Sequence, residues 1–191
     1  MDSEIRKLTP DLAEDYVRFF DTTPHDDNID EHKCYCVCWC NDAFESQDFS
    51  TAEKRREYAY LYVKGGNIQG YLAYAGNKAV GWCNANIKSE CLRCESWQRF
   101  MHYVPLDDIN TGLKVKSIFC FVIAPEMKRK GIATLLMERV CLDAEREGFD
   151  FIEAYPYKGT DFGGHYEMYG KHGFQVTLET EHGYVMRKYL K

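Results

Sequence analysis

The amino-acid sequence predicts an α/β fold in which helices flank a mixed β-sheet. Short strand-like runs alternate with amphipathic helical segments along the chain. Residues 116–124 form a strongly apolar run, which is typical of a strand buried on both faces. Pairs of short strand-like runs are joined by tight turns, which indicates hairpins and therefore antiparallel pairing.

The first half of the chain begins with an expected edge strand at residues 2–8. Thr9 is a good N-cap and Pro10 suits the first helical position, so a helix is expected to follow. Further along the chain we expect a helix at 51–64 that ends at Gly65-Gly66, and a hairpin of strands 70–75 and 79–85. Residues 86–113 are polar and irregular, and we interpret them as a long connection or insertion.

The second half continues with the apolar strand at 116–124 and a helix at 131–147. One face of this helix is expected to contain the apolar residues Ile132, Leu135, Leu136, Val140 and Ala144. A strand at 149–155, a glycine-rich loop, a short helix near 166–172 and a final hairpin follow. We find no internal repeat or linker, so residues 1–191 are expected to form one domain.

The bulk composition is that of an ordinary globular protein. The chain has 191 residues, 45% hydrophobic and 28% charged, with a net charge of −6. Nucleic-acid binding is disfavoured because it needs a clustered basic surface. There is no apolar run of about 18 residues and no signal-peptide pattern, so we expect no membrane partner and a cytoplasmic location. The nine cysteines are then expected as free thiols or metal ligands rather than disulfides.

Residues 122–133 are the most informative segment, because a strand leads there through a short loop into a helix. The first turn of a helix leaves backbone N–H groups without acceptors, and the helix dipole favours an anion. Gly131 and Ala133 are small enough for a phosphate to approach the backbone, and Lys128, Arg129 and Lys130 add positive charge. The segment favours phosphate binding, and a solvated basic turn before an ordinary helix is the alternative.

This segment resembles the acetyl-CoA motif of the GNAT superfamily of N-acetyltransferases. The family pattern, Arg/Gln-x-x-Gly-x-Gly/Ala, stands here as Lys128-Arg-Lys-Gly131-Ile-Ala133. Lys128 replaces the usual Arg or Gln, and Arg129 stands where Gly is common. The order of predicted elements resembles the family over nearly the whole chain. The resemblance implies a mostly antiparallel mixed sheet with a V-shaped cleft that takes acetyl-CoA as co-substrate.

The resemblance also assigns contacts to this co-substrate. The pantetheine arm is expected beside Phe121, Val122 and Ile123, where a backbone N–H can polarise the thioester carbonyl. The phosphates are expected on the segment that follows, which comprises Lys128, Arg129, Lys130, Gly131, Ile132, Ala133 and Thr134.

Tyr169 is the candidate catalytic acid. It begins a Tyr-x-x-x-Gly-Phe sequence like that of the family, whose tyrosine protonates the departing CoA thiolate. Core packing is the alternative role for this residue. An amine acceptor must lose a proton before it attacks, and Glu153 is the first candidate base, with Asp161 and His165 as others. Each of these can instead be structural or solvated.

Four cysteines alternate from Cys34 to Cys40, and a C-x-x-C pair lies at 91–94. Their spacing does not match paired zinc motifs, so we assign no metal ligand. Four roles for these cysteines remain open: inert packing, lining of an acceptor pocket, metal binding and redox sensing. Trp39, which lies within the Cys34–Cys40 segment, is a candidate acceptor contact. Trp82 and Asn84 on the predicted hairpin are two further candidates.

The leading functional hypothesis is an acyl-CoA-dependent N-acyltransferase that acetylates the amine of a small-molecule acceptor, acting as a monomer or homodimer. We expect direct attack rather than a cysteine-linked intermediate, because no cysteine lies in a nucleophile motif. A protein or peptide N-acetyltransferase is the first alternative, and an open acidic groove would favour it. A metal- or thiol-sensing binding module with a vestigial CoA site is the alternative from another class.

Overall fold

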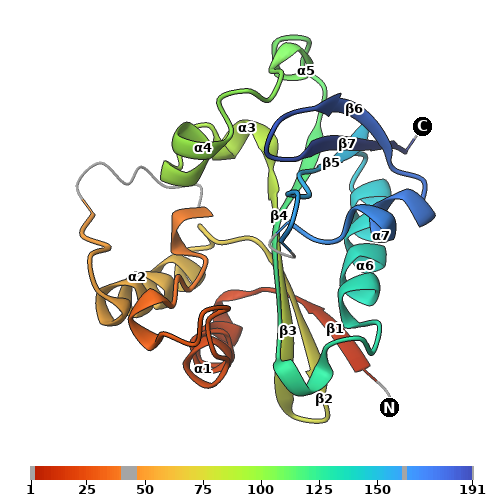
Figure 1. The fold of residues 1–191 in the computed structure, drawn as a ribbon. Coiled ribbons are helices and arrows are strands. Elements are labelled where there is room, and N and C mark those ends of the chain that lie inside the picture. The colour runs from red at the N-terminus through yellow and green to blue at the C-terminus, as the bar shows by residue number, and fades with distance from the viewer. Residues whose placement is uncertain (1–2, 40–46, 161–162, 191) are drawn as a thin grey trace.

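The computed structural model of the protein describes residues 3–39, 47–160 and 163–190 (Figure 1). Its centre is a seven-stranded sheet. In spatial order the strands are β1 (Ser3–Lys7), β2 (Gly70–Ala75), β3 (Lys78–Ile87), β4 (Val115–Ile123), β5 (Phe151–Ala154), β7 (Tyr184–Tyr189) and β6 (Gln175–Glu179). β4 and β5 are parallel and all other neighbouring pairs are antiparallel, which confirms the predicted fold class.

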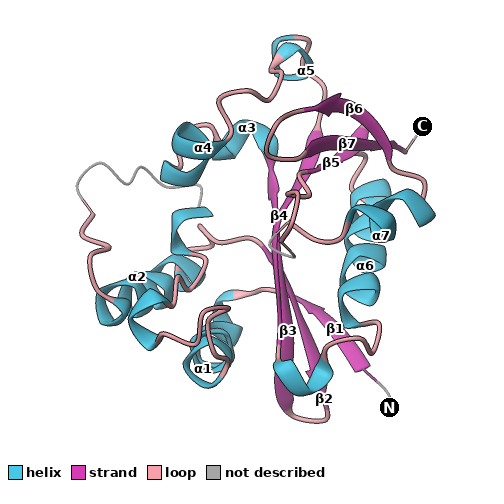
Figure 2. Ribbon diagram, viewed as in Figure 1, coloured by secondary structure: helices cyan, strands magenta, loops and turns pink. Residues whose placement is uncertain are grey.

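Helices cover both faces of this sheet (Figure 2). The longer ones are α1 (Ala13–Thr22), α2 (Ala52–Lys64) and α6 (Ile132–Arg146), and the shorter ones are α3 (Lys88–Cys91), α4 (Glu95–Phe100), α5 (Asp107–Asn110) and α7 (Tyr166–Lys171). In Figure 1, α1 and α2 lie on one side of the sheet and α6 and α7 on the other. Within the described residues, no helix is both long and apolar enough to cross a membrane.

The helix starts follow the predicted signals in part, because Thr9 is the N-cap residue but its side chain makes no capping hydrogen bond. Pro10 opens a short 3-10 turn, Pro10–Leu12, that leads into α1. The side chain of Thr51 accepts a hydrogen bond from the backbone N–H of Lys54 at 3.2 Å, which caps α2. The buried face of α6 contains Ile132, Leu136, Met137, Val140 and Ala144. Leu135 was predicted on that face, but it is 40% exposed because its position lies at the edge of the apolar stripe.

Two irregularities of β4 create the site described below. β4 pairs with β5 only over Val115–Ile118, whereas β4 itself continues to Ile123. The two parallel strands therefore separate along the second half of β4. In addition, Asn84 of β3 pairs with Cys120 and Ala85 pairs with Ile118, so Phe119 has no partner on β3 and forms a β-bulge.

Residues 86–113 contain the three short helices α3, α4 and α5 rather than an irregular loop. Their connection to the sheet is a buried ion pair: the Lys88 ammonium lies 2.8 Å from a carboxylate oxygen of Glu153 in β5. Lys88 also pairs with Asp108 of α5 at 3.0 Å. Whether this segment is an insertion into a single domain stays a prediction.

Candidate functional site

A cavity of about 490 Å³ lies where β4 separates from β5. One part of its lining comes from the second half of β4, from the loop between β4 and α6, and from the first turn of α6. The other part comes from the start of α7 and from residues in the range 20–34, which begins at the end of α1. This volume lies within the roughly 300–1,000 Å³ that is usual for small-molecule sites. The cavity therefore joins segments that are far apart in the sequence.

The loop between β4 and α6 has the backbone geometry of an anion-binding site. Arg129 has a φ of 62° and Gly131 has a φ of 80°, both in the left-handed region. No side chain caps α6, so the helix itself offers no acceptor to the N–H groups of its first turn. A Cβ built on Gly131 would meet nothing within 4 Å, so a ligand can approach the backbone there.

The predicted CoA contacts are brought together almost completely. All of them except one line the same cavity: Phe121, Val122, Ile123, Lys128, Arg129, Gly131, Ile132, Ala133 and Thr134. Lys130 belongs to the same loop but is exposed and does not line the cavity. Their contact with CoA stays a prediction.

The edge of β4 beyond Ile118 is the second feature of the site. Among the described residues, its backbone has a strand partner on the β3 side and none on the β5 side, because β5 ends at Ala154. Backbone groups exposed on that side can accept and donate hydrogen bonds to an extended ligand, much as an added strand would. The cavity therefore offers a linear row of polar groups that ends at the first turn of α6.

Tyr169 lies directly behind the cavity wall. Its side chain is fully buried, its ring packs against Phe174 with centroids 5.0 Å apart, and its hydroxyl donates to the carbonyl of Gly163 at 2.8 Å. A Cβ added at Gly164, which lines the cavity, would lie 3.0 Å from the Tyr169 hydroxyl. Burial raises the pKa of the phenol well above its usual value, so the hydroxyl stays protonated at neutral pH.

Substitution of Tyr169 by phenylalanine tests its predicted role as acid. We expect kcat for acetyl transfer to fall by about 100-fold or more, with little change in the KM for acetyl-CoA, because the ring and its packing remain. Stability should fall by about 1–3 kcal/mol, because the buried Gly163 carbonyl loses its donor. Steady-state kinetics and urea unfolding of the same preparation separate the two effects. An unchanged kcat with reduced stability would assign Tyr169 to packing alone.

The candidate bases lie in different surroundings. Glu153 is fully buried, and its carboxylate contacts Lys88 at 2.8 Å and Arg187 at 2.6 Å and accepts from Tyr155 at 2.7 Å. Such a carboxylate is held by its partners, and this arrangement favours a structural role. His165 is exposed and lines the cavity. Asp161 lies outside the described residues.

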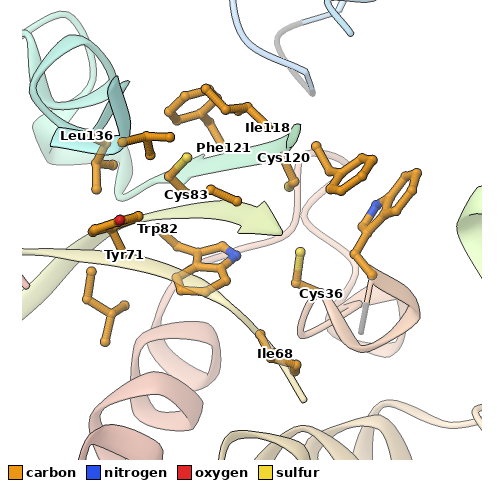
Figure 3. Close-up of a cluster of buried hydrophobic side chains, with 14 of the residues drawn as sticks. Cys36, Ile68, Tyr71, Trp82, Cys83, Ile118, Cys120, Phe121 and Leu136 are labelled. Atoms are coloured by element: carbon orange, nitrogen blue, oxygen red, sulfur yellow. The ribbon is translucent and has the colours of Figure 1, made fainter. Parts of the chain in front are cut away.

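The predicted acceptor contacts Trp39, Trp82 and Asn84 are all buried. Figure 3 shows Trp82 within a cluster of buried hydrophobic side chains that also contains Cys36 and Cys120. The Asn84 side chain donates to the carbonyl of Trp39 at 3.2 Å, and the Trp39 ring stacks on Phe119 with centroids 4.5 Å apart. Trp82 is fully buried and packs edge-on against Tyr16. None of the three predicted residues lines the described cavity, and their role as acceptor contacts stays a prediction.

The cysteine segment forms a turn followed by a 3-10 helix at Val37–Trp39, neither a strand nor an α-helix. Tyr35 and Cys36 both have left-handed φ values, of 49° and 53°. The Tyr16 hydroxyl holds this turn by donating to the carbonyl of Tyr35 at 2.7 Å. The eight described cysteines are free, whereas Cys40 lies outside the described residues.

Two cysteines, Cys34 and Cys120, line the cavity, and Cys36 lies behind them. Burial and the neighbouring Cys36 raise the pKa of Cys34 to about 12. A hydrogen bond with Cys36, together with burial, raises the pKa of Cys120 well above its usual value. Both thiols that face the cavity are therefore neutral at neutral pH.

The sequence interpretation missed one wall of the cavity. The loop that follows α1 contributes to this wall Thr23, Pro24, His25, Asp26 and Asn28. The closely spaced histidines and aspartates of this loop were the available signal. Sequence periodicity cannot show which loops fold back over a cavity.

Comparison with known proteins agrees with this geometry. A sequence profile described as the acetyltransferase (GNAT) family matches residues 6–174. Comparison with curated proteins finds no significant relative. A GNAT-family acetyltransferase from Streptococcus pneumoniae has a similar structure, with a TM-score of 0.54 at 18% identity over 100% of both chains.

Two further solved structures show the same fold. PaiA N-acetyltransferase from Thermoplasma acidophilum, solved in complex with coenzyme A, has a TM-score of 0.57 at 16% identity over 99% of each chain. The ribosomal-protein-S18-alanine N-acetyltransferase from Escherichia coli has a TM-score of 0.56 at 11% identity over 100% of this chain and 95% of that chain. Because the family profile spans most of the sequence, the chain belongs to the GNAT family of acetyltransferases.

Proposed function

We propose that this protein transfers the acetyl group of acetyl-CoA to the amine of a small-molecule acceptor, by direct attack of the amine on the thioester. One observation carries the proposal: the uncapped first turn of α6, with Arg129 and Gly131 in left-handed conformations, opens into a cavity that continues along the unpaired edge of β4. A linear ligand with phosphates at one end and amide groups in its middle matches this arrangement.

The charges around the loop support a phosphate-bearing ligand. Lys128 and Arg129 both line the cavity at the start of α6, where the helix dipole is also positive. Cations at this end oppose the dipole by roughly 0.3–1 kcal/mol each at exposed sites. A bound pyrophosphate would remove this cost and accept hydrogen bonds from the free N–H groups of the first turn.

The wall formed by residues 20–34 supports an amine acceptor. It includes the Asp26 carboxylate and the Lys33 ammonium, and Lys33 is paired with Asp30 at 2.9 Å. The Asp26 carboxylate can attract an ammonium group before that group loses its proton and attacks.

The state of the cysteines supports direct attack. A thiol must ionise to act as a nucleophile, and the raised pKa values of Cys34 and Cys120 keep both thiols that face the cavity neutral. In the proposed step the amine nitrogen forms a bond to the acetyl carbon, and the carbon–sulfur bond to CoA breaks. Tyr169 supplies a proton to the departing thiolate, and the proton that the nitrogen loses on becoming an amide restores the Tyr169 hydroxyl, with water as the carrier. A backbone N–H at the free edge of β4 would stabilise the oxyanion.

An acceptor screen tests this proposal. The protein is incubated with acetyl-CoA and either small primary amines and diamines or lysine-containing and N-terminally free peptides, and released CoA thiol and acetylated product mass are measured. We expect turnover with at least one small amine and loss of it in Tyr169→Phe. Turnover with peptides alone would assign a peptide acetyltransferase. Tight acetyl-CoA binding without turnover on any amine would favour a binding module.

A further inference from the structure

His25, Asp27 and His32 converge in the loop between α1 and α2. The two oxygens of the Asp27 carboxylate contact the two rings separately: Oδ1 lies 2.7 Å from Nδ1 of His25, and Oδ2 lies 2.6 Å from Nδ1 of His32. One ligand atom from each of the three side chains lies within 4.8 Å of the others. Two imidazoles and a carboxylate arranged in this way form the ligand set that zinc commonly takes in sites with an open position.

The distances between the ring nitrogens and the Asp27 carboxylate oxygens are compatible with a metal ion taking the place of the ring protons between them. Around a tetrahedral zinc with bonds of about 2.0–2.1 Å, neighbouring ligand atoms lie about 3.3 Å apart. The two N···O contacts must therefore widen by less than about 1 Å, and the ring protons between nitrogen and carboxylate oxygen would leave as the ion enters. The side chains are 34–56% exposed, so small rotations of this size meet little resistance.

The backbone orients the central ligand. The N–H of Ile29 donates to Oδ1 of Asp27 at 3.0 Å, and the N–H of Asn28 donates to the carbonyl of His25 at 2.8 Å. Hydrogen bonds of this kind to a ligating carboxylate fix its direction and raise metal affinity. All three ligands come from one short segment, so the site forms without contacts from distant parts of the chain.

The local charge also favours a cation. Asp26, Asp30 and Glu31 belong to the same loop. Of the cations at this loop, Lys33 is paired with Asp30 at 2.9 Å, and Arg55 donates to the backbone carbonyls of Glu31 and Lys33. Within the described ranges, no other group of three or more His, Cys, Asp or Glu side chains brings its ligand atoms as close.

We propose that His25, Asp27 and His32 form a binding site for a divalent transition-metal ion, with Zn²⁺ as the best match. Three protein ligands leave a coordination position for water or for a ligand oxygen or nitrogen. His25 also lines the cavity, so the bound ion would lie at its rim, on the wall opposite the phosphate-binding loop of α6. This site is independent of the proposed acetyl transfer and requires no acetyl-CoA.

Calorimetric titration of the tag-free protein with zinc chloride, without acetyl-CoA, tests the proposal. We expect one equivalent to bind, and we expect Asp27→Asn and His32→Ala each to weaken binding by at least roughly tenfold. His182→Ala, which alters an exposed histidine outside the site, is the matched control and should bind as the unaltered protein does. Circular dichroism verifies that each variant is folded.

Cysteine thiols are the main competing ligands, so Cys34→Ser is included. Zinc binding that persists in Cys34→Ser and weakens in Asp27→Asn and His32→Ala supports the site. Binding that is lost in Cys34→Ser but retained in the other two variants would place the ion on thiolates and overturn the proposal. Absence of any binding at millimolar zinc would also overturn it, whatever the outcome of the acetyl-transfer assays.

Discussion

Replacement of Lys88 by methionine is expected to lower the free energy of unfolding by about 3–5 kcal/mol. The Lys88 side chain has no exposed surface, and its ammonium contacts Asp108 at 3.0 Å and Glu153 at 2.8 Å. It also donates to the carbonyl of Pro105 at 2.7 Å. Methionine replaces most of the apolar part of the side chain but leaves two buried carboxylates with too little positive charge.

The remaining cation cannot compensate for this loss. Arg187 contacts Glu153 at 2.6 Å but lies 3.9 Å from Asp108. In the intact protein two cations balance two anions in a region that water does not reach, and this balance is what makes removal of one member costly. The loss of stability therefore arises mainly because Asp108 is left without a close cation and because residues 86–113 lose their ion pair with the sheet.

Urea unfolding monitored by circular dichroism measures this effect. Lys78→Met is the matched control, because Lys78 pairs with Glu126 at 3.0 Å but both side chains are more than half exposed. We expect the control to cost less than about 1 kcal/mol. A Lys88→Met/Asp108→Asn double variant should recover part of the lost stability. Equal unfolding free energies for Lys88→Met and Lys78→Met would contradict the structural role of the network.

The fold could be predicted where local sequence determines local structure. The continuous apolar run of β4 and the apolar residues spaced three or four apart in α6 are signals that the chain carries within a single element. The three short helices of residues 86–113 could not be predicted. They are only one to two turns long, and contacts such as the Lys88–Glu153 pair with distant β5 hold them in place.

The candidate site also has parts that could be predicted from the sequence and parts that could not. The loop at Gly131 could be predicted because its chemistry belongs to the backbone and to adjacent residues. Glu153, near the end of its predicted strand, was the first candidate base, with a structural role as the alternative. Its partners, Lys88 and Arg187, are far away in the sequence, so their pairing became visible only in the folded chain. The same reason explains why the wall formed by residues 20–34 was missed.

Substitution of Gly131 by glutamate is expected to weaken acetyl-CoA binding by at least about 100-fold, or ~2.7 kcal/mol. A Cβ at this position meets no other atom within 4 Å, so the new side chain projects into open space beside the first turn of α6. A carboxylate there would occupy the place of a phosphate, and like charges brought together cost several kcal/mol. Lys128 and Arg129 would then pair with the new carboxylate instead of with the ligand.

Calorimetric titration with acetyl-CoA of the unaltered protein, Gly131→Glu and Gly148→Glu tests the central claim most directly. Gly148 follows the C-terminus of α6, has a φ of 72° against 80° for Gly131, and likewise has open space around its Cβ. Both variants therefore carry the same charge and similar backbone strain. We predict micromolar binding by the unaltered protein and by Gly148→Glu, and none by a folded Gly131→Glu. Equal binding by both variants, or no binding by the unaltered protein, would contradict a CoA site at the start of α6.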